Sequence, residues 1–160
     1  MRYSLSETNQ VEIEVINPLE IAKNPILLDI TLKLFNQLDK AQITYYKPFG
    51  IPWNTWSKED LLKWLPKYHK FYFLKETTSE KVVGLVALMK SMYPNTYLCR
   101  EIVIDRLYRG KGLGRYLLSN VISTNKPSRL CLQCSEPNQA GIRLYESLGF
   151  RTASRFMITK

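Results

Sequence analysis

Three glycines spaced two residues apart, Gly110, Gly112 and Gly114, lie between a strand-like apolar run and an apolar helical stripe. The start of a helix presents unpaired backbone N–H groups and the positive end of the helix dipole, which together favour an anion. Glycine has no Cβ, so a phosphate can approach its backbone closely. Cationic side chains surround the same turn at Arg109, Lys111 and Arg115. The pattern therefore predicts a cradle for a diphosphate.

The spacing excludes two common phosphate-binding motifs. A P-loop requires GxxxxGK followed by Ser or Thr, and neither Gly110 nor Gly112 begins such a run. A dinucleotide fingerprint GxGxxG that began at Gly112 would need glycine at 117, which is leucine. One that began at Gly110 would need glycine at 115, which is arginine. Neither nucleotide-binding motif fits the turn.

A scaffold of alternating strands and helices positions this turn. Apolar runs predict strands over 11–16, 71–77, 82–90, 96–104 and 129–134, with a strand-like end after residue 149. Helical spacing predicts helices over 19–38, 57–68 and 113–122, and a last one between Pro137 and Gly149. Several neighbouring strands are joined by short turns and are expected to be antiparallel. The fold class is α/β (α+β), with a mixed, mostly antiparallel central sheet flanked by helices.

Length and composition are those of one globular domain, which we place over residues 1–160. Apolar residues make up 45% and charged residues 23% of the chain, the usual balance for a soluble protein. No run approaches the ~20 apolar residues of a membrane span, and the opening segment is not typical of a signal peptide. We expect a cytoplasmic protein with no membrane partner.

The three cysteines are Cys99, Cys131 and Cys134. An odd, small number without a secretory signal favours reduced thiols. Cys131 and Cys134 have CxxC spacing, but side chains three apart on a strand point to opposite faces. We therefore expect buried structural thiols and no metal.

The chain carries 23 basic against 14 acidic residues, a net charge of +9. Such an excess attracts polyanions, among which nucleic acid, a membrane surface and a phosphorylated cofactor all qualify. The basic residues are spread along the chain and form no cluster with interleaved aromatics. Nucleic-acid binding is therefore a weaker alternative, and no nucleic-acid partner is expected.

The run Arg109-x-x-Gly112-x-Gly114 resembles the acyl-CoA loop of the GNAT superfamily of N-acetyltransferases, which reads Arg/Gln-x-x-Gly-x-Gly/Ala between a strand and a helix. The segment 138–150 is similar to the family's Asn…Leu-Tyr-Glu…Leu-Gly-Phe segment, and 82–88 is like its third strand. The resemblance covers about half of the chain, and the first half matches in element order alone. It implies transfer of an acetyl group from acetyl-CoA to a primary amine of a small molecule, peptide or protein, by direct attack on the thioester.

The resemblance also implies how coenzyme A is held. In the family, the strand before the loop offers its backbone to the pantetheine amides, and a β-bulge splays this strand from the next. Asn138 either bonds to the pantetheine arm or is only a helix-start residue. The implied cofactor-binding set is Ile102, Val103, Ile104, Arg109, Gly110, Lys111, Gly112, Leu113, Gly114, Arg115 and Asn138.

Two catalytic residues follow from the same resemblance. Tyr145 occupies the position of the family's frequent catalytic tyrosine and is expected to protonate the leaving thiolate; the alternative is a ring that only packs on the sheet. One branch of the family has a glutamate as base where this chain has Gln133, which cannot accept a proton as a carboxylate would. Glu101 is the nearest candidate base. A paired structural carboxylate and a water relay are its alternatives.

The residues that line the acceptor-binding site are expected to come from the first half of the chain. Residues 45–56 contain five aromatics and two prolines, which either line a concavity for the acceptor or form a satellite core. A second function stays open, a catalytically silent module that binds or senses acyl-CoA. The sequence is compatible with a monomer or a homodimer.

Overall fold

One six-stranded sheet organises the chain. The computed structural model describes residues 3–4, 10–49, 55–155, 157 and 159. The strands are β1 (Tyr3–Ser4), β2 (Gln10–Ile16), β3 (Lys70–Glu76), β4 (Val82–Lys90), β5 (Thr96–Ile104) and β6 (Arg129–Leu132). Their order in the sheet follows their order in the chain, and every neighbouring pair is antiparallel except β5 and β6, which are parallel. The predicted mixed, mostly antiparallel sheet is confirmed.

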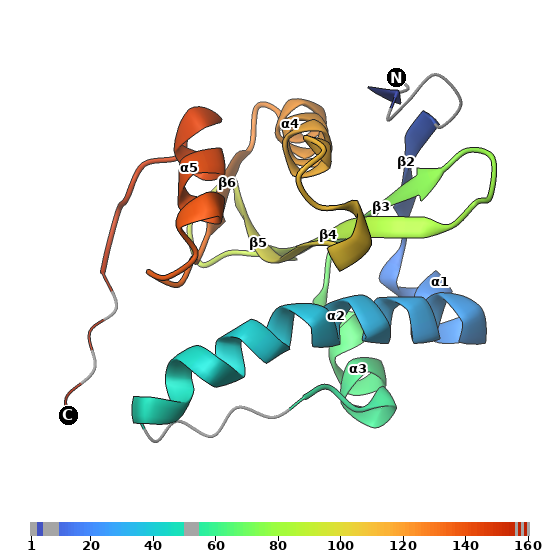
Figure 1. The fold of residues 1–160 in the computed structure, drawn as a ribbon, viewed down its shortest axis with the longest axis horizontal. Coiled ribbons are helices and arrows are strands. Elements are labelled where there is room, and N and C mark those ends of the chain that lie inside the picture. The colour runs from blue at the N-terminus through green and yellow to red at the C-terminus, as the bar shows by residue number, and fades with distance from the viewer. Residues whose placement is uncertain (1–2, 5–9, 50–54, 156, 158, 160) are drawn as a thin grey trace.

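Helices cover both faces of this sheet. They are α1 (Pro18–Lys23), α2 (Pro25–Tyr46), α3 (Lys58–Trp64), α4 (Leu113–Asn125) and α5 (Gln139–Ser147), with short 3-10 turns η1 (Lys47–Phe49), η2 (Leu65–Lys67) and η3 (Arg106–Tyr108). Helices α1, α2 and α3 lie on one side of the sheet, and α4 and α5 lie on the other (Figure 1). Each side has its own apolar core. Residues 82–88 of β4 are buried throughout, as expected for a central strand between two helical layers.

Two predicted helices are interrupted within their apolar patterns. The pattern over 19–38 is broken between α1 and α2, where Asn24 accepts hydrogen bonds from the N–H groups of Ile26 and Leu27 at 3.0 and 3.2 Å. Pro25 has no N–H to continue α1 but suits the first position of a new helix. Similarly, α3 ends at Trp64 and η2 follows, with Pro66 inside it.

The strand-like end expected after residue 149 is wrong within the described residues. Residues 151–155 are exposed and form no strand. This segment reads RTASR, and four of its five side chains are polar. It therefore has little apolar surface with which to join a buried sheet.

Candidate functional site

The glycine-rich turn joins β5 to α4 and begins the helix without a side-chain cap. Gly110 and Gly112 have φ of 77° and 76°, a left-handed conformation that glycine adopts with little steric cost. Gly112 is the N-cap of α4 and, as a glycine, makes no side-chain capping bond to the N–H groups of the first turn. The next residue, Leu113, is 1% exposed and fixes the start of the helix in the core. The first turn of α4 thus has the character of an anion site.

Gly114 is where α4 comes closest to its neighbours. A Cβ built on Gly114 would lie 3.3 Å from Leu144 Cδ2 of α5 and 3.9 Å from Ile104 Cγ1 of β5. A larger side chain there would push the helix away from both elements. The third glycine of the motif therefore serves close packing at the meeting point of β5, α4 and α5.

The three cations predicted around the turn have different surroundings. Arg109 Nε donates to the Ile104 carbonyl at 2.9 Å, which fastens the loop to the end of β5. Arg115 Nη2 donates to Ser147 Oγ at 2.6 Å and ties α4 to α5. Lys111 Nζ lies 5.4 Å from the centroid of the Tyr108 ring. Arg109 therefore also holds the loop in shape, and Arg115 also holds α4 against α5.

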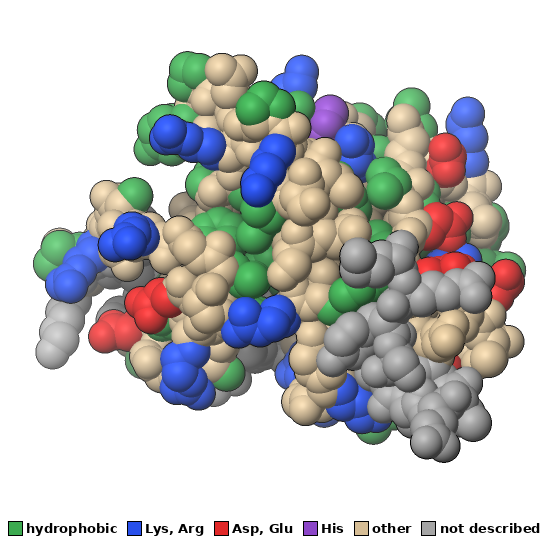
Figure 2. Space-filling model, turned by 90° about the horizontal axis from the view of Figure 1, so that it is seen from above, with side chains coloured by type: hydrophobic (Ala, Val, Ile, Leu, Met, Phe, Trp, Pro, Cys, Tyr) green, Lys and Arg blue, Asp and Glu red, His purple; other side chains and the backbone are tan. Residues whose placement is uncertain are grey.

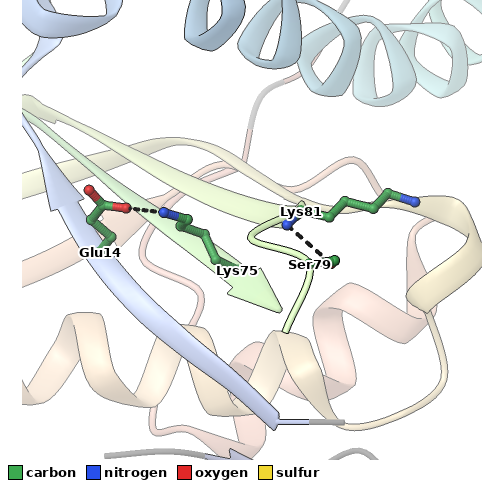
Figure 3. A network of polar contacts seen from close by, with 4 residues as sticks. All are labelled: Glu14, Lys75, Ser79 and Lys81. Atoms are coloured by element: carbon green, nitrogen blue, oxygen red, sulfur yellow. Dashed lines mark hydrogen bonds and ion pairs between the residues drawn. The ribbon is translucent and has the colours of Figure 1, made fainter. Parts of the chain in front are cut away.

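A fourth cation, which the sequence did not point to, reaches the same loop from the β3–β4 turn. Lys81 Nζ lies 5.0 Å from the centroid of the Tyr108 ring, so Tyr108 has two lysines near it. Figure 3 shows Lys81 extending from the turn, where its N–H also donates to Ser79 Oγ, beside the separate Glu14–Lys75 ion pair. No sequence signal could join Lys81 to Tyr108, because only the sheet brings these segments together.

A buried carboxylate supports this cluster. Glu76 is 9% exposed and accepts a hydrogen bond from Ser79 Oγ at 2.6 Å. That bond, a hydrogen bond from Tyr108 and the charges of Lys81 and Lys111 hold the pKa of Glu76 below its ordinary value against the opposing effect of burial. Glu76 is therefore ionised at neutral pH and helps to hold the two lysines by the loop.

The sheet opens between β5 and β6 beside this loop. Pairing of the two strands runs from Thr96↔Arg129 to Cys99↔Leu132 and stops there. Residues 100–104 of β5 continue with no strand on that edge in the described part of the chain. The register between β4 and β5 also shifts at this point, since Ala87 pairs with Glu101 and Leu88 with Cys99. Arg100 is thus the extra residue of a β-bulge, and the expected bulge is present.

The alternation of the strand decides which backbone groups face the open edge. Asp105 N–H donates to the Val83 carbonyl of β4 at 2.8 Å. Backbone groups of successive residues point to opposite edges, so those of Val103 are directed to β4 and those of Ile102 and Ile104 to the open edge. The Ile104 carbonyl already accepts from Arg109. Of the three predicted residues, Ile102 and Ile104 offer backbone to a ligand beside β5.

Tyr145 lies on the α4–α5 side of the sheet. Its ring packs against the core there and meets the Phe150 ring edge-on, with centroids 6.0 Å apart. Burial, with smaller contributions from Cys134 and Cys99, raises the pKa of Tyr145 to about 12. The ring therefore packs on the sheet, as one alternative held, and its hydroxyl also keeps a proton throughout the physiological pH range.

Glu101 lies on the other side, facing α2 and α3. It is 2% exposed, and its Oε1 lies 3.3 Å from Arg100 Nη1 and 3.5 Å from the Tyr68 hydroxyl. Tyr68 belongs to the core under α2. Glu101 is therefore a paired, buried carboxylate in the protein without ligand. Sequence reasoning named Glu101 but missed Arg100 and Tyr68.

Other predicted residues have structural partners. Asn138 caps α5, and its Oδ1 accepts from the Gly141 N–H at 3.0 Å. Trp56 lies edge-on to Phe35 and Trp64 at centroid distances of 5.5 and 6.1 Å, so this end of the aromatic segment belongs to the core. Residues 50–54, in the middle of that segment, lie outside the described residues.

Among the described residues, neither a metal-ligand cluster nor a membrane-spanning helix is found. Cys99, Cys131 and Cys134 are free thiols, and among the described residues no three His, Cys, Asp or Glu side chains gather as metal ligands would. None of the described helices combines the length and apolar character needed to cross a membrane.

Comparisons with known proteins agree with this geometry. Residues 37–150 match the family model described as the acetyltransferase (GNAT) family. A protein of Danio rerio named N-acetylaspartate synthetase is 35% identical over 91 residues, which are 50% of this chain and 32% of that protein. The chain spans about a third or less of the length of the curated relatives that it matches.

Solved structures share the fold. A Bacillus halodurans protein superposes with a TM-score of 0.72 at 17% identity, covering 93% of this chain and 99% of that one. The ribosomal-protein-S18-alanine N-acetyltransferase of Escherichia coli superposes with a TM-score of 0.65 at 22% identity, covering 90% of this chain and 79% of that one.

Proposed function

This chain belongs to the acetyltransferase (GNAT) family, and on that premise we propose that it transfers an acetyl group from acetyl-CoA to a primary amine. The observation that carries the proposal is the juxtaposition of the uncapped start of α4 with the unpaired edge of β5. A ligand with a diphosphate and an extended amide-bearing arm is complementary to both. Coenzyme A has these two parts.

The loop and the strand would hold the cofactor by different groups. The N–H groups at the start of α4 would bind the diphosphate, with Lys111 and Lys81 adding positive charge nearby. The backbone of Ile102 and Ile104 would bond to the amides of the arm as an added strand does. Acetyl-CoA would bring an activated acyl group to the gap between β5 and β6.

Two side chains on opposite faces of the sheet would manage the protons. An alkyl amine with a pKa of ~10.4 is neutral in about one molecule in two thousand at pH 7, so a base beside it accelerates the reaction. Glu101, at the β5 bulge, would accept that proton. Tyr145, which burial keeps protonated, would deliver a proton to the departing thiolate from the other face.

The acceptor is proposed to be an amine of a small molecule, peptide or protein. The name N-acetylaspartate synthetase, carried by the Danio rerio relative, makes free amino acids a class to test. The alternative, a silent module that binds or senses acyl-CoA, is compatible with the cofactor cradle but needs no acid, and Tyr145 would then only pack in the core.

The test is incubation of the purified protein with acetyl-CoA and a panel of amines, amino acids and peptides, followed by mass spectrometry of the products. We expect a mass increase of one acetyl group on an acceptor and release of CoA. Binding of CoA by calorimetry without modification of any acceptor would support the silent module. Absence of CoA binding would contradict both.

A further inference from the structure

Arg100 and Glu101 are neighbours in the sequence, yet their charged groups meet on one side of the sheet. The distance from Arg100 Nη1 to Glu101 Oε1 is 3.3 Å. In a regular strand, consecutive side chains point to opposite faces. The one-residue shift of register against β4 makes this contact possible, because Arg100 has no partner in β4. The bulge therefore builds an adjacent pair of opposite charges.

The pair sits at the place proposed for transfer. It begins one residue after Cys99, where the pairing of β5 with β6 ends. Glu101 faces α2 and α3, opposite the face that carries Tyr145. An acceptor that arrives from the α2 side meets Arg100 first, because the Arg100 side chain is 37% exposed and that of Glu101 only 2%.

Because Glu101 is buried, breaking its ion pair with Arg100 is costly unless another cation replaces the guanidinium. A buried carboxylate that loses its positive partner is strongly destabilised. An amine that approaches Glu101 as an ammonium ion can replace the guanidinium there, and the displaced guanidinium of Arg100, whose side chain is 37% exposed, can then bind a new anion. An α-amino acid brings both charges, joined through a single carbon atom. Its ammonium group can take the place of the guanidinium while its carboxylate binds the guanidinium that has moved.

We propose that the Arg100–Glu101 pair selects α-amino acids as acceptors, with Glu101 receiving the ammonium group and Arg100 the carboxylate. The inference rests on the proposed acetyl transfer and adds the chemical class of the acceptor. The guanidinium is suited to this role because its planar fork binds a carboxylate with two parallel hydrogen bonds. Arg100 is a specificity-determining residue in this scheme, and Glu101 acts on the reacting amine.

The experiment compares two acceptors that differ in one charge, L-alanine and L-alaninamide, with L-aspartate as a third. In the unmodified protein we expect kcat/KM for alanine to exceed that for alaninamide by about 10- to 100-fold, the range of a charge-assisted hydrogen-bonded contact. Arg100→Gln should remove this preference through a higher KM for the amino acids. The KM for alaninamide should change little. Arg100→Lys, which keeps the charge without the fork, should fall between the two.

Controls separate selection from loss of structure. Calorimetry should show that both Arg100 variants bind CoA as the unmodified protein does. Arg129→Gln removes an exposed arginine at the start of β6 and should leave the preference intact. Equal use of alanine and alaninamide by the unmodified protein, or a preference that survives Arg100→Gln, would overturn this inference and leave acetyl transfer standing. If CoA binds but no acceptor is modified, the proposed transfer fails and this inference fails with it.

Discussion

Replacement of Gly112 by asparagine and by aspartate tests the anion site at the start of α4. Gly112 has φ of 76° and is the N-cap of the helix. Asparagine and aspartate are nearly equal in size, and both tolerate the left-handed conformation better than other residues with a side chain. The pair therefore adds the same bulk at the same strained position. The two variants differ in one negative charge.

The negative charge of Gly112→Asp should lower the affinity for CoA and raise the stability of the protein without ligand. A carboxylate about 5 Å from a bound phosphate group, at an effective dielectric constant of 20 to 80, costs about 1–3 kcal/mol per unit charge. A diphosphate carries at least two charges, so the loss is about 2 kcal/mol or more, a factor of about 30 in affinity. Without ligand, the same carboxylate beside the positive end of α4 stabilises the helix by about 0.3–1 kcal/mol.

Calorimetric titration with CoA and thermal unfolding without ligand measure the two effects. We expect Gly112→Asp to bind CoA about 30-fold or more weakly than Gly112→Asn, and to melt about 1–4 °C higher, since 1 kcal/mol corresponds to about 2–4 °C for a domain of this size. Equal CoA affinity in the two variants would refute the reasoning, because a diphosphate held at this helix start has to sense the added charge.

Four further experiments test other parts of the structure. Tyr145→Phe should leave CoA affinity within about twofold and slow turnover about 100-fold; unchanged turnover would remove Tyr145 from the mechanism. Burial raises the pKa of Tyr145 to about 12, and the hydroxyl is protonated below its pKa. A pH–rate profile should therefore show no loss from this group at pH 10, and a decline there that Tyr145→Phe abolished would contradict the raised pKa. Burial also raises the pKa of Cys99 to about 12, so about one Cys99 thiol in ten thousand is ionised at pH 8. Peptide mass spectrometry should therefore find Cys99 unmodified by iodoacetamide until the protein unfolds. Gly84→Ala would place a Cβ 2.7 Å from Ile104 Cδ1 and 3.0 Å from the Val103 carbonyl oxygen. Urea unfolding should therefore show a loss of about 1–3 kcal/mol in the free energy of unfolding. An unchanged unfolding midpoint would show that β5 can shift to accommodate the added methyl group.

Local patterns predicted the elements that local residues decide. The bounds of β5 match the predicted strand over 96–104, because an unbroken β-prone run is flanked by a turn at Asn95 and by Asp105, which caps η3. The left-handed glycines at 110 and 112 were likewise visible as a turn before a helical stripe. The break between α1 and α2 was not predicted, since the apolar spacing of 19–38 continues across Asn24 and Pro25.

The candidate site was only partly predictable because its contacts depend on strand register. Glu101 could be named from the sequence, but its ion pair with Arg100 exists because β4 and β5 shift by one residue. The approach of Lys81 to Tyr108 depends on the pairing of β4 with β5, which brings the β3–β4 turn beside the loop after β5. Register is a property of the whole sheet and of the cores on both of its faces.

The strand order has a consequence for how the protein acquires its shape. From β3 to β5 each strand pairs with the next one along the chain across a short turn, and folding is faster when contacts are local in sequence. The parallel partner β6 can add only after α4 has crossed over the sheet. We expect the meander to form first, with Glu101 already in its register. The gap between β5 and β6, together with α5 and its Tyr145, would form last. The folding chain would therefore have its antiparallel strands in place well before the proposed active site was complete.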